Sequence, residues 1–90
     1  MRVLVTIEVD TEAGNEANRD DLMRSTIKSF LEQVQPEAAY FSPTHGQRCA
    51  YVVFDLPEPS RMPVLFEPLW QVLNAKIHVR PVMNRAEMVA

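Results

Sequence analysis

The residues most able to perform chemistry in this chain are His78 and Glu8. A carboxylate beside an imidazole fixes the tautomer of the ring and makes it more basic, as a general base requires. If their strands are neighbours, His78 meets Thr6 or Glu8 across a spacing of about 5 Å. His78 and Glu8 are therefore the catalytic candidates, and a cross-strand charge pair lining a protein interface is the alternative.

A small-molecule pocket is the site that would surround this pair. Tyr51 and Trp70 offer apolar walls, and Thr6 and Arg80 offer polar contacts. Trp70 also fits an ordinary core position, because it recurs with other apolar residues at helical spacing. The predicted ligand pocket consists of Thr6, Tyr51, Trp70 and Arg80.

The remaining reactive side chains predict neither a metal centre nor a cofactor. Cys49 is the only cysteine, so no internal disulfide and no cysteine zinc site can form. A strand is expected between Cys49 and His78, which separates them by roughly 9 to 10 Å and leaves an unreactive buried thiol. His45, beside Gly46, is expected in a solvated turn far from His78, so no two-histidine metal site is predicted within one subunit.

Composition places these residues in one small domain, residues 1–90. Hydrophobic residues make up 47% of the chain, enough to bury a core. The net charge is −3 and the basic residues are scattered singly, which argues against binding to nucleic acid or to an anionic membrane surface. Because no signal peptide and no apolar run of about twenty residues is present, the cytoplasm is the expected location.

The first half of the chain predicts a strand, a helix and a hairpin. Residues 2–10 alternate between apolar and polar, as a strand with one buried face does. Residues 10–18 are polar and hold Gly14, which predicts a loop. A helix capped by Asn18 should then run to Pro36.

The second half predicts further strands and a second helix. Residues 38–42 and 48–56 read as two strands of a hairpin around the turn at 43–47. A helix capped by Ser60 and ending at Asn74 should follow, with Pro68 inside it. A last strand covers residues 75–83, and a capping box predicts a short terminal helix.

This order of elements, β-α-β-β-α-β, predicts a ferredoxin-like α+β fold. Right-handed crossovers place both helices on one face of a four-stranded antiparallel sheet, in the order fourth, first, third, second. Leu4, Tyr51 and Val53 then lie at the centre of the other face, which should be polar if it is solvated. An apolar centre with a charged rim is typical of an interface, so these three residues predict a homodimer.

Three stretches of the chain resemble small proteins of the dimeric α+β barrel superfamily. They are Ala50-Tyr51-Val52-Val53-Phe54-Asp55, Phe66-Glu67-Pro68-Leu69-Trp70 and Val79-Arg80-Pro81-Val82-Met83. The resemblance runs from about Val3 to Glu87 and implies a dimeric barrel of two sheets. Characterised branches include cofactor-independent monooxygenases, lactone isomerases and haem enzymes. Their catalytic residues differ from branch to branch, and none transfers to this sequence.

Three functions follow as expectations. The first is a homodimeric small-molecule-binding protein, which includes a cofactor-independent enzyme of monooxygenase or isomerase type acting on an apolar or aromatic metabolite. The second is a dimeric interaction protein without catalysis. The third is an RNA-recognition module, because Ala50–Phe54 partly matches its motif; however, Arg48 and Cys49 replace the expected glycine and aromatic residue.

Overall fold

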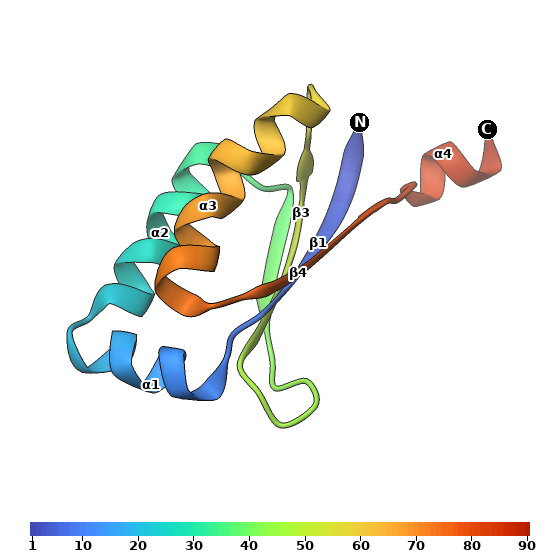
Figure 1. The fold of residues 1–90 in the computed structure, drawn as a ribbon. Coiled ribbons are helices and arrows are strands. Elements are labelled where there is room, and N and C mark those ends of the chain that lie inside the picture. Colours follow the sequence, from blue (N-terminus) through green and yellow to red (C-terminus); the bar gives the residue numbers. More distant parts are fainter.

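Four antiparallel strands form the sheet of the computed structural model, which describes residues 1–90 (Figure 1). The strands are β1 (Arg2–Glu8), β2 (Ala38–Phe41), β3 (Cys49–Asp55) and β4 (Lys76–Pro81). Their order across the sheet is β2-β3-β1-β4, which confirms the predicted order 4-1-3-2. The helices α1 (Thr11–Arg19), α2 (Leu22–Val34) and α3 (Met62–Leu73) cover one face (Figure 1).

The core lies between that face and the helices. Alternation along β1 and β3 turns one apolar stripe of each strand inward, as successive side chains of a strand point to opposite faces. Phe54 of β3 meets Phe30 of α2 edge to face, with ring centroids 6.0 Å apart. Burying each such side chain contributes about 1.5–3 kcal/mol. The core residues are Val3, Val5, Ile7, Val9, Ala17, Phe30, Ala50, Val52, Phe54, Leu56, Leu65, Phe66, Leu69 and Leu73.

The prediction of a loop at residues 10–18 is wrong, because α1 occupies them. Asp10 caps this helix, and its carboxylate accepts a hydrogen bond of 3.0 Å from the Ala13 amide. Gly14 is buried within α1, where a Cβ would lie 2.9 Å from Val9 Cγ1 and 2.9 Å from Arg48 Nη1. The glycine therefore permits close packing of the helix and does not mark a turn.

The second helix of the chain, α2, begins at Leu22 and not at the predicted cap, Asn18. Asp21 precedes it in the left-handed region, with φ of 59°, and its side chain makes no capping hydrogen bond. The helix ends at Val34, followed by Gln35 with φ of 48° and then by Pro36. The predicted end at the proline is confirmed, because the residue before a proline avoids the helical region.

The helix α3 follows a short 3₁₀ turn, Pro59–Arg61. Ser60 does not cap it, since the hydroxyl donates to Glu58 Oε2 at 3.3 Å. Pro63 lies in the first turn, where its missing N–H costs little, and Asn74 ends the helix with φ of 45°. The predicted helix is thus present, but its start and its cap differ.

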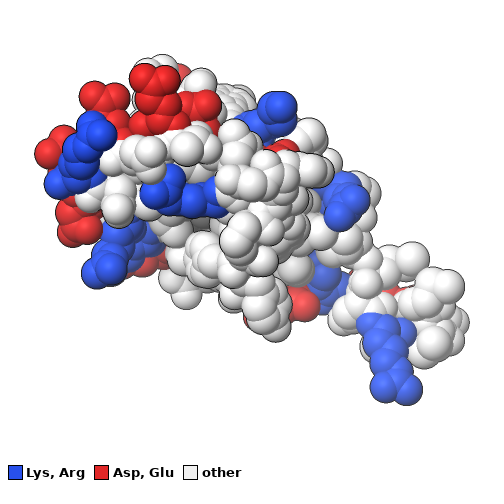
Figure 2. All heavy atoms as spheres, turned by 90° about the horizontal axis from the view of Figure 1, so that it is seen from below, with Lys and Arg blue, Asp and Glu red and all other residues white.

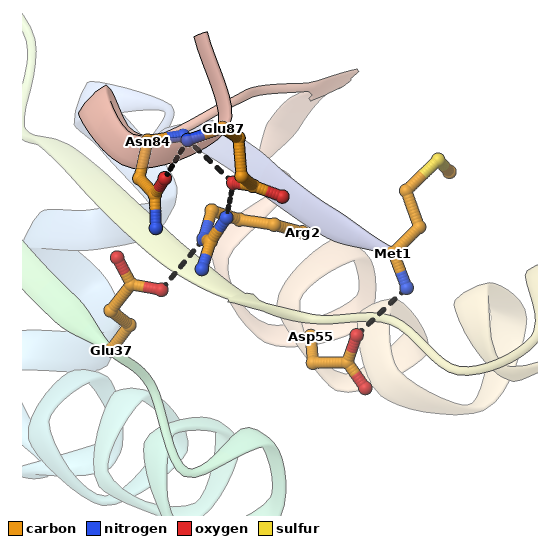
Figure 3. A network of polar contacts seen from close by, with 6 residues as sticks. All are labelled: Met1, Arg2, Glu37, Asp55, Asn84 and Glu87. Atoms are coloured by element: carbon orange, nitrogen blue, oxygen red, sulfur yellow. Dashed lines mark hydrogen bonds and ion pairs between the residues drawn. The ribbon is translucent and has the colours of Figure 1, made fainter. Parts of the chain in front are cut away.

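A short helix, α4 (Arg85–Val89), lies beyond β4 and away from the other helices (Figure 1). The predicted capping box is present: the Glu87 amide donates to Asn84 Oδ1 at 2.8 Å, and the Asn84 amide donates to Glu87 Oε1 at 2.9 Å. Arg2 connects this helix to the sheet, because it pairs with Glu87 and, at 2.7 Å, with Glu37 (Figure 3). None of the helices combines the length and the apolar character needed to cross a membrane.

Candidate functional site

The site candidates gather on the face of the sheet that no helix covers, called here the open face. Strand register sets their order, because residues opposite each other on neighbouring strands share a face. Leu4 lies between Val53 and Arg80, Thr6 between Tyr51 and His78, and Glu8 between Cys49 and Lys76. The structure therefore brings Thr6, Glu8, Tyr51, His78 and Arg80 onto one surface.

Glu8 is the polar centre of the open face. Its Oε2 lies 3.4 Å from His78 Nε2, so the predicted carboxylate and imidazole do meet across β1 and β4. Its Oε1 lies 3.2 Å from His45 Nδ1. The expectation that the two histidines lie far apart is wrong, since both contact one carboxylate that is itself only 13% exposed.

The surroundings of Glu8 favour its ionised form. The hydrogen bond to His45 lowers the pKa of Glu8 below its ordinary value of 4.5, and partial desolvation opposes this effect. The nearby charges of His45, His78 and Lys76 lower the pKa further. Glu8 is consequently an anion near neutral pH, able to orient either imidazole.

The turn between β2 and β3 carries His45 to this carboxylate. His45 and Gly46 have positive φ angles of 54° and 74°, as both central residues of a type I′ turn require. Thr44 and Gln47 flank them and exchange backbone hydrogen bonds of 2.9 and 3.0 Å. The predicted turn at residues 43–47 is present, but the sequence pattern does not indicate the direction in which His45 points.

The same turn also engages Tyr51. The hydroxyl groups of Thr44 and Tyr51 are hydrogen-bonded to each other. Together with the contact between His45 and Glu8, this hydrogen bond attaches the turn at two points to one end of the open face. Cys49, the strand partner of Glu8, is only 4% exposed there, and β1 separates it from His78 as expected.

Trp70 does not join the other predicted pocket residues. It belongs to α3, on the opposite side of the sheet from Tyr51, and its ring packs against Phe66 with centroids 6.1 Å apart. The predicted pocket walled by both Tyr51 and Trp70 therefore does not form within one chain. Thr6, Tyr51 and Arg80 remain together.

The apolar part of the open face reaches the edge of the sheet. Leu4, Tyr51 and Val53 are half-buried at its centre, and Tyr40 lies opposite Tyr51 on the edge strand β2 with 69% of its surface exposed. His, Cys, Asp and Glu side chains form no group of three or more arranged to hold a metal ion.

Acidic side chains gather elsewhere on the molecule. Figure 2 shows most of them at the end that carries α1, where some Lys and Arg side chains also lie, and other Lys and Arg side chains are scattered over the rest of that view. The acidic residues of α1 and the junction after it are Glu12, Glu16, Asp20 and Asp21. The open face is thus distinct from the most acidic part of the surface.

Comparisons with known proteins identify a fold and no family. No protein family profile matches the chain, and no curated protein matches its sequence. Among solved structures it is similar to the "De novo designed protein Ferredog-Diesel", with a TM-score of 0.51 and 10% identity over 90% of this chain and 85% of that chain. A likeness at this identity concerns the fold alone. The chain has a ferredoxin-like α+β fold with an uncovered sheet face that carries a Glu8, His45 and His78 cluster.

Proposed function

We propose that the chain acts as a homodimer in which two open faces meet and enclose a small-molecule site, as in the dimeric α+β barrels that its sequence resembles. The observation that carries this proposal is the apolar strip of Leu4, Tyr51 and Val53, half-buried at the centre of the sheet with no helix over it. Covering apolar surface is the dominant driving force of association. A second copy of the same face is the simplest cover.

The rim of the strip supports the same arrangement. Arg80 and Lys76 lie on β4, Glu8 and Arg2 on β1, and Asp55 at the end of β3. Apolar centres with polar rims are typical of protein interfaces. Glu8, Arg2 and Asp55 already form ion pairs within the chain, so Lys76 and Arg80 are the rim charges left to pair with a second copy.

The chemistry of the enclosed site would come from His78, Glu8 and Arg80. Glu8 fixes the orientation of the His78 ring, which remains open to solvent in the single chain and can reach a ligand. Arg80 offers hydrogen-bond donors to a polar or anionic group, and Thr6 and Tyr51 border the same space. Such a site suits general-base chemistry on an apolar or aromatic metabolite, without a cofactor.

A dimer without catalysis is the second candidate, and one observation favours it. Both oxygens of Glu8 are engaged by histidines, and the Tyr51 hydroxyl is bonded to Thr44. These contacts tie the turn and β4 to β1, which is a structural role. In this case the cluster would stabilise the surface that forms the dimer.

The dimer is tested by two neighbouring residues of β2 that point to opposite faces. Tyr40 is on the open face, whereas Phe41, 59% exposed, is on the helix-covered face. We expect sedimentation velocity to show a dimer for the wild type and Phe41→Asp, and a monomer for Tyr40→Asp. A wild type that stays monomeric up to millimolar concentration would contradict the proposal.

The small-molecule site is tested by His78→Ala and Glu8→Ala, with a panel of aromatic metabolites screened by saturation-transfer NMR. Loss of binding while the dimer persists supports the site. Weakening of the dimer alone, with no metabolite bound by the wild type, supports the dimer without catalysis instead.

A further inference from the structure

A large cleft lies between α2 and the edge of the sheet, on the side opposite to the open face. Its volume is about 1000 Å³, and its walls come from α2, the end of β2 and the start of β3. Binding sites for small molecules have volumes of about 300–1,000 Å³. The cleft is therefore large enough for a ligand, and none of the predicted pocket residues lines it.

The floor of the cleft is apolar. Met23, Ile27 and Leu31 succeed one another at four-residue spacing along α2, so they share one face of the helix. Phe41 and Ala50 face them from paired positions on β2 and β3. Phe41 points toward the helix layer and yet remains 59% exposed, because no helix covers the end of this edge strand.

The rim of the cleft is cationic. Arg24 and Lys28 are one turn apart on α2, and Arg48 lies across the cleft at the start of β3. None of the three takes part in an ion pair; the ion pairs of the chain are all formed by other residues. Glu32 is the only carboxylate in the lining.

This local excess of positive charge runs against the chain as a whole, whose net charge is −3. Arg24 and Lys28 also repel each other weakly, as like charges one helical turn apart do. The three cations form no ion pair, so they can receive an anion above an apolar floor. One of them, Arg48, is held in position by a hydrogen bond of 3.0 Å from its Nη2 to Asn15 Oδ1.

We propose that this cleft binds a small amphipathic carboxylate, with an aliphatic chain on the apolar floor and the carboxylate among Arg24, Lys28 and Arg48. Burial of the chain would supply the bulk of the affinity. Guanidinium groups bind carboxylates through paired hydrogen bonds, which would fix the orientation of the head group. This site is separate from the open face, so the proposal holds whether or not the chain dimerises there.

The probe is decanoate, compared with decan-1-ol and decyltrimethylammonium, which share its chain and differ in the charge of the head. Isothermal titration calorimetry should show saturable binding of one decanoate per chain. Binding of the alcohol and the cation should be weaker by about tenfold or more, because hydrogen bonds to charged groups are lost. Equal affinity for all three probes, or no saturable binding of decanoate, would overturn the proposal.

Matched variants locate the site. Phe41→Asp should weaken decanoate binding by about tenfold or more, and Tyr40→Asp, the adjacent residue on the other face, should leave it unchanged. Arg24→Gln should weaken binding, whereas Arg61→Gln on the exposed 3₁₀ turn should not. Circular dichroism checks that each variant is folded.

Two results would refute the placement of the ligand. Weaker binding in Tyr40→Asp with normal binding in Phe41→Asp would move the ligand to the open face. A change of oligomeric state in Phe41→Asp would mean that a second copy occupies the cleft. The dimer proposed above can fail without affecting the binding readout, since decanoate binding is measured per chain.

Discussion

At the residue scale, Glu8 holds two segments that are distant in sequence. One oxygen contacts His78 on β4, and the other contacts His45 in the turn between β2 and β3. A single side chain at the end of β1 thereby joins an edge strand to a hairpin turn. Removing the Glu8 carboxylate should therefore loosen both β4 and the turn.

Acid should reveal the contribution of Glu8 to stability. Because its pKa is lowered in the folded chain, Glu8 stabilises the fold at pH values above its ordinary pKa of 4.5 and loses this contribution as the pH falls through the folded value. We expect the free energy of unfolding of the wild type to fall more between about pH 5 and pH 3 than that of Glu8→Gln.

Urea denaturation at each pH measures this difference, and Glu16→Gln, on the exposed side of α1, serves as the control. The control should keep the steep acid dependence of the wild type. Identical slopes for wild type and Glu8→Gln would contradict the lowered pKa.

The Glu8 and His78 half of this cluster is accessible to sequence reasoning, and the His45 half is not. Strand alternation and the expected order of the sheet put Glu8 and His78 on one face of neighbouring strands. The position of His45 depends on two consecutive positive φ angles in a turn, at 54° and 74°. No apolar pattern encodes such a turn, so its direction is visible only in the structure.

At the scale of elements, α1 is the feature that sequence reasoning missed. Its residues are mainly polar, and a glycine near the middle is usually a signal for a turn. Gly14 instead allows the helix to approach the side chains of Val9 and Arg48 closely. The cap at Asp10 was a usable signal, because a carboxylate followed by helix-compatible residues is typical of a helix start.

Asp10→Ala should therefore destabilise the fold by about 1 kcal/mol, because the Ala13 amide loses its hydrogen-bond acceptor. Thermal and urea unfolding measure this loss. Asp20→Ala, at the other end of α1, removes a carboxylate that makes no capping hydrogen bond there and should cost less. Equal costs for the two variants would contradict the role of Asp10 as a cap.

At the scale of the whole molecule, the element order and the two apolar stripes predict the sheet order and the side that the helices cover. Both are confirmed. The cleft beside α2 could not be predicted. It exists because α2 does not cover the end of β2, and the sequence does not specify the position of the helix over the sheet. Residue types in a helix indicate which face is apolar, but not how much of that face is buried against the sheet.

A homodimer should be stabilised by mass action. The melting temperature of the wild type should rise with protein concentration, since association favours the folded chain. Tyr40→Asp should melt at the same temperature at all concentrations, and Phe41→Asp should behave as the wild type does. Calorimetric scans over about a hundredfold range of concentration measure the dependence. A melting temperature independent of concentration in all three proteins would contradict a dimer.

The burial of Cys49 makes its thiol a natural reporter of local opening. The chain has one thiol, and it is 4% exposed at the end of the sheet where the turn is fastened through Thr44 and His45. We expect a maleimide to label the thiol when the contacts of Thr44 with Tyr51 and of His45 with Glu8 break and that end of the sheet opens. When labelling is slow compared with closing, its rate therefore reports the population of chains in which the turn has detached, and the native thiol serves as the probe.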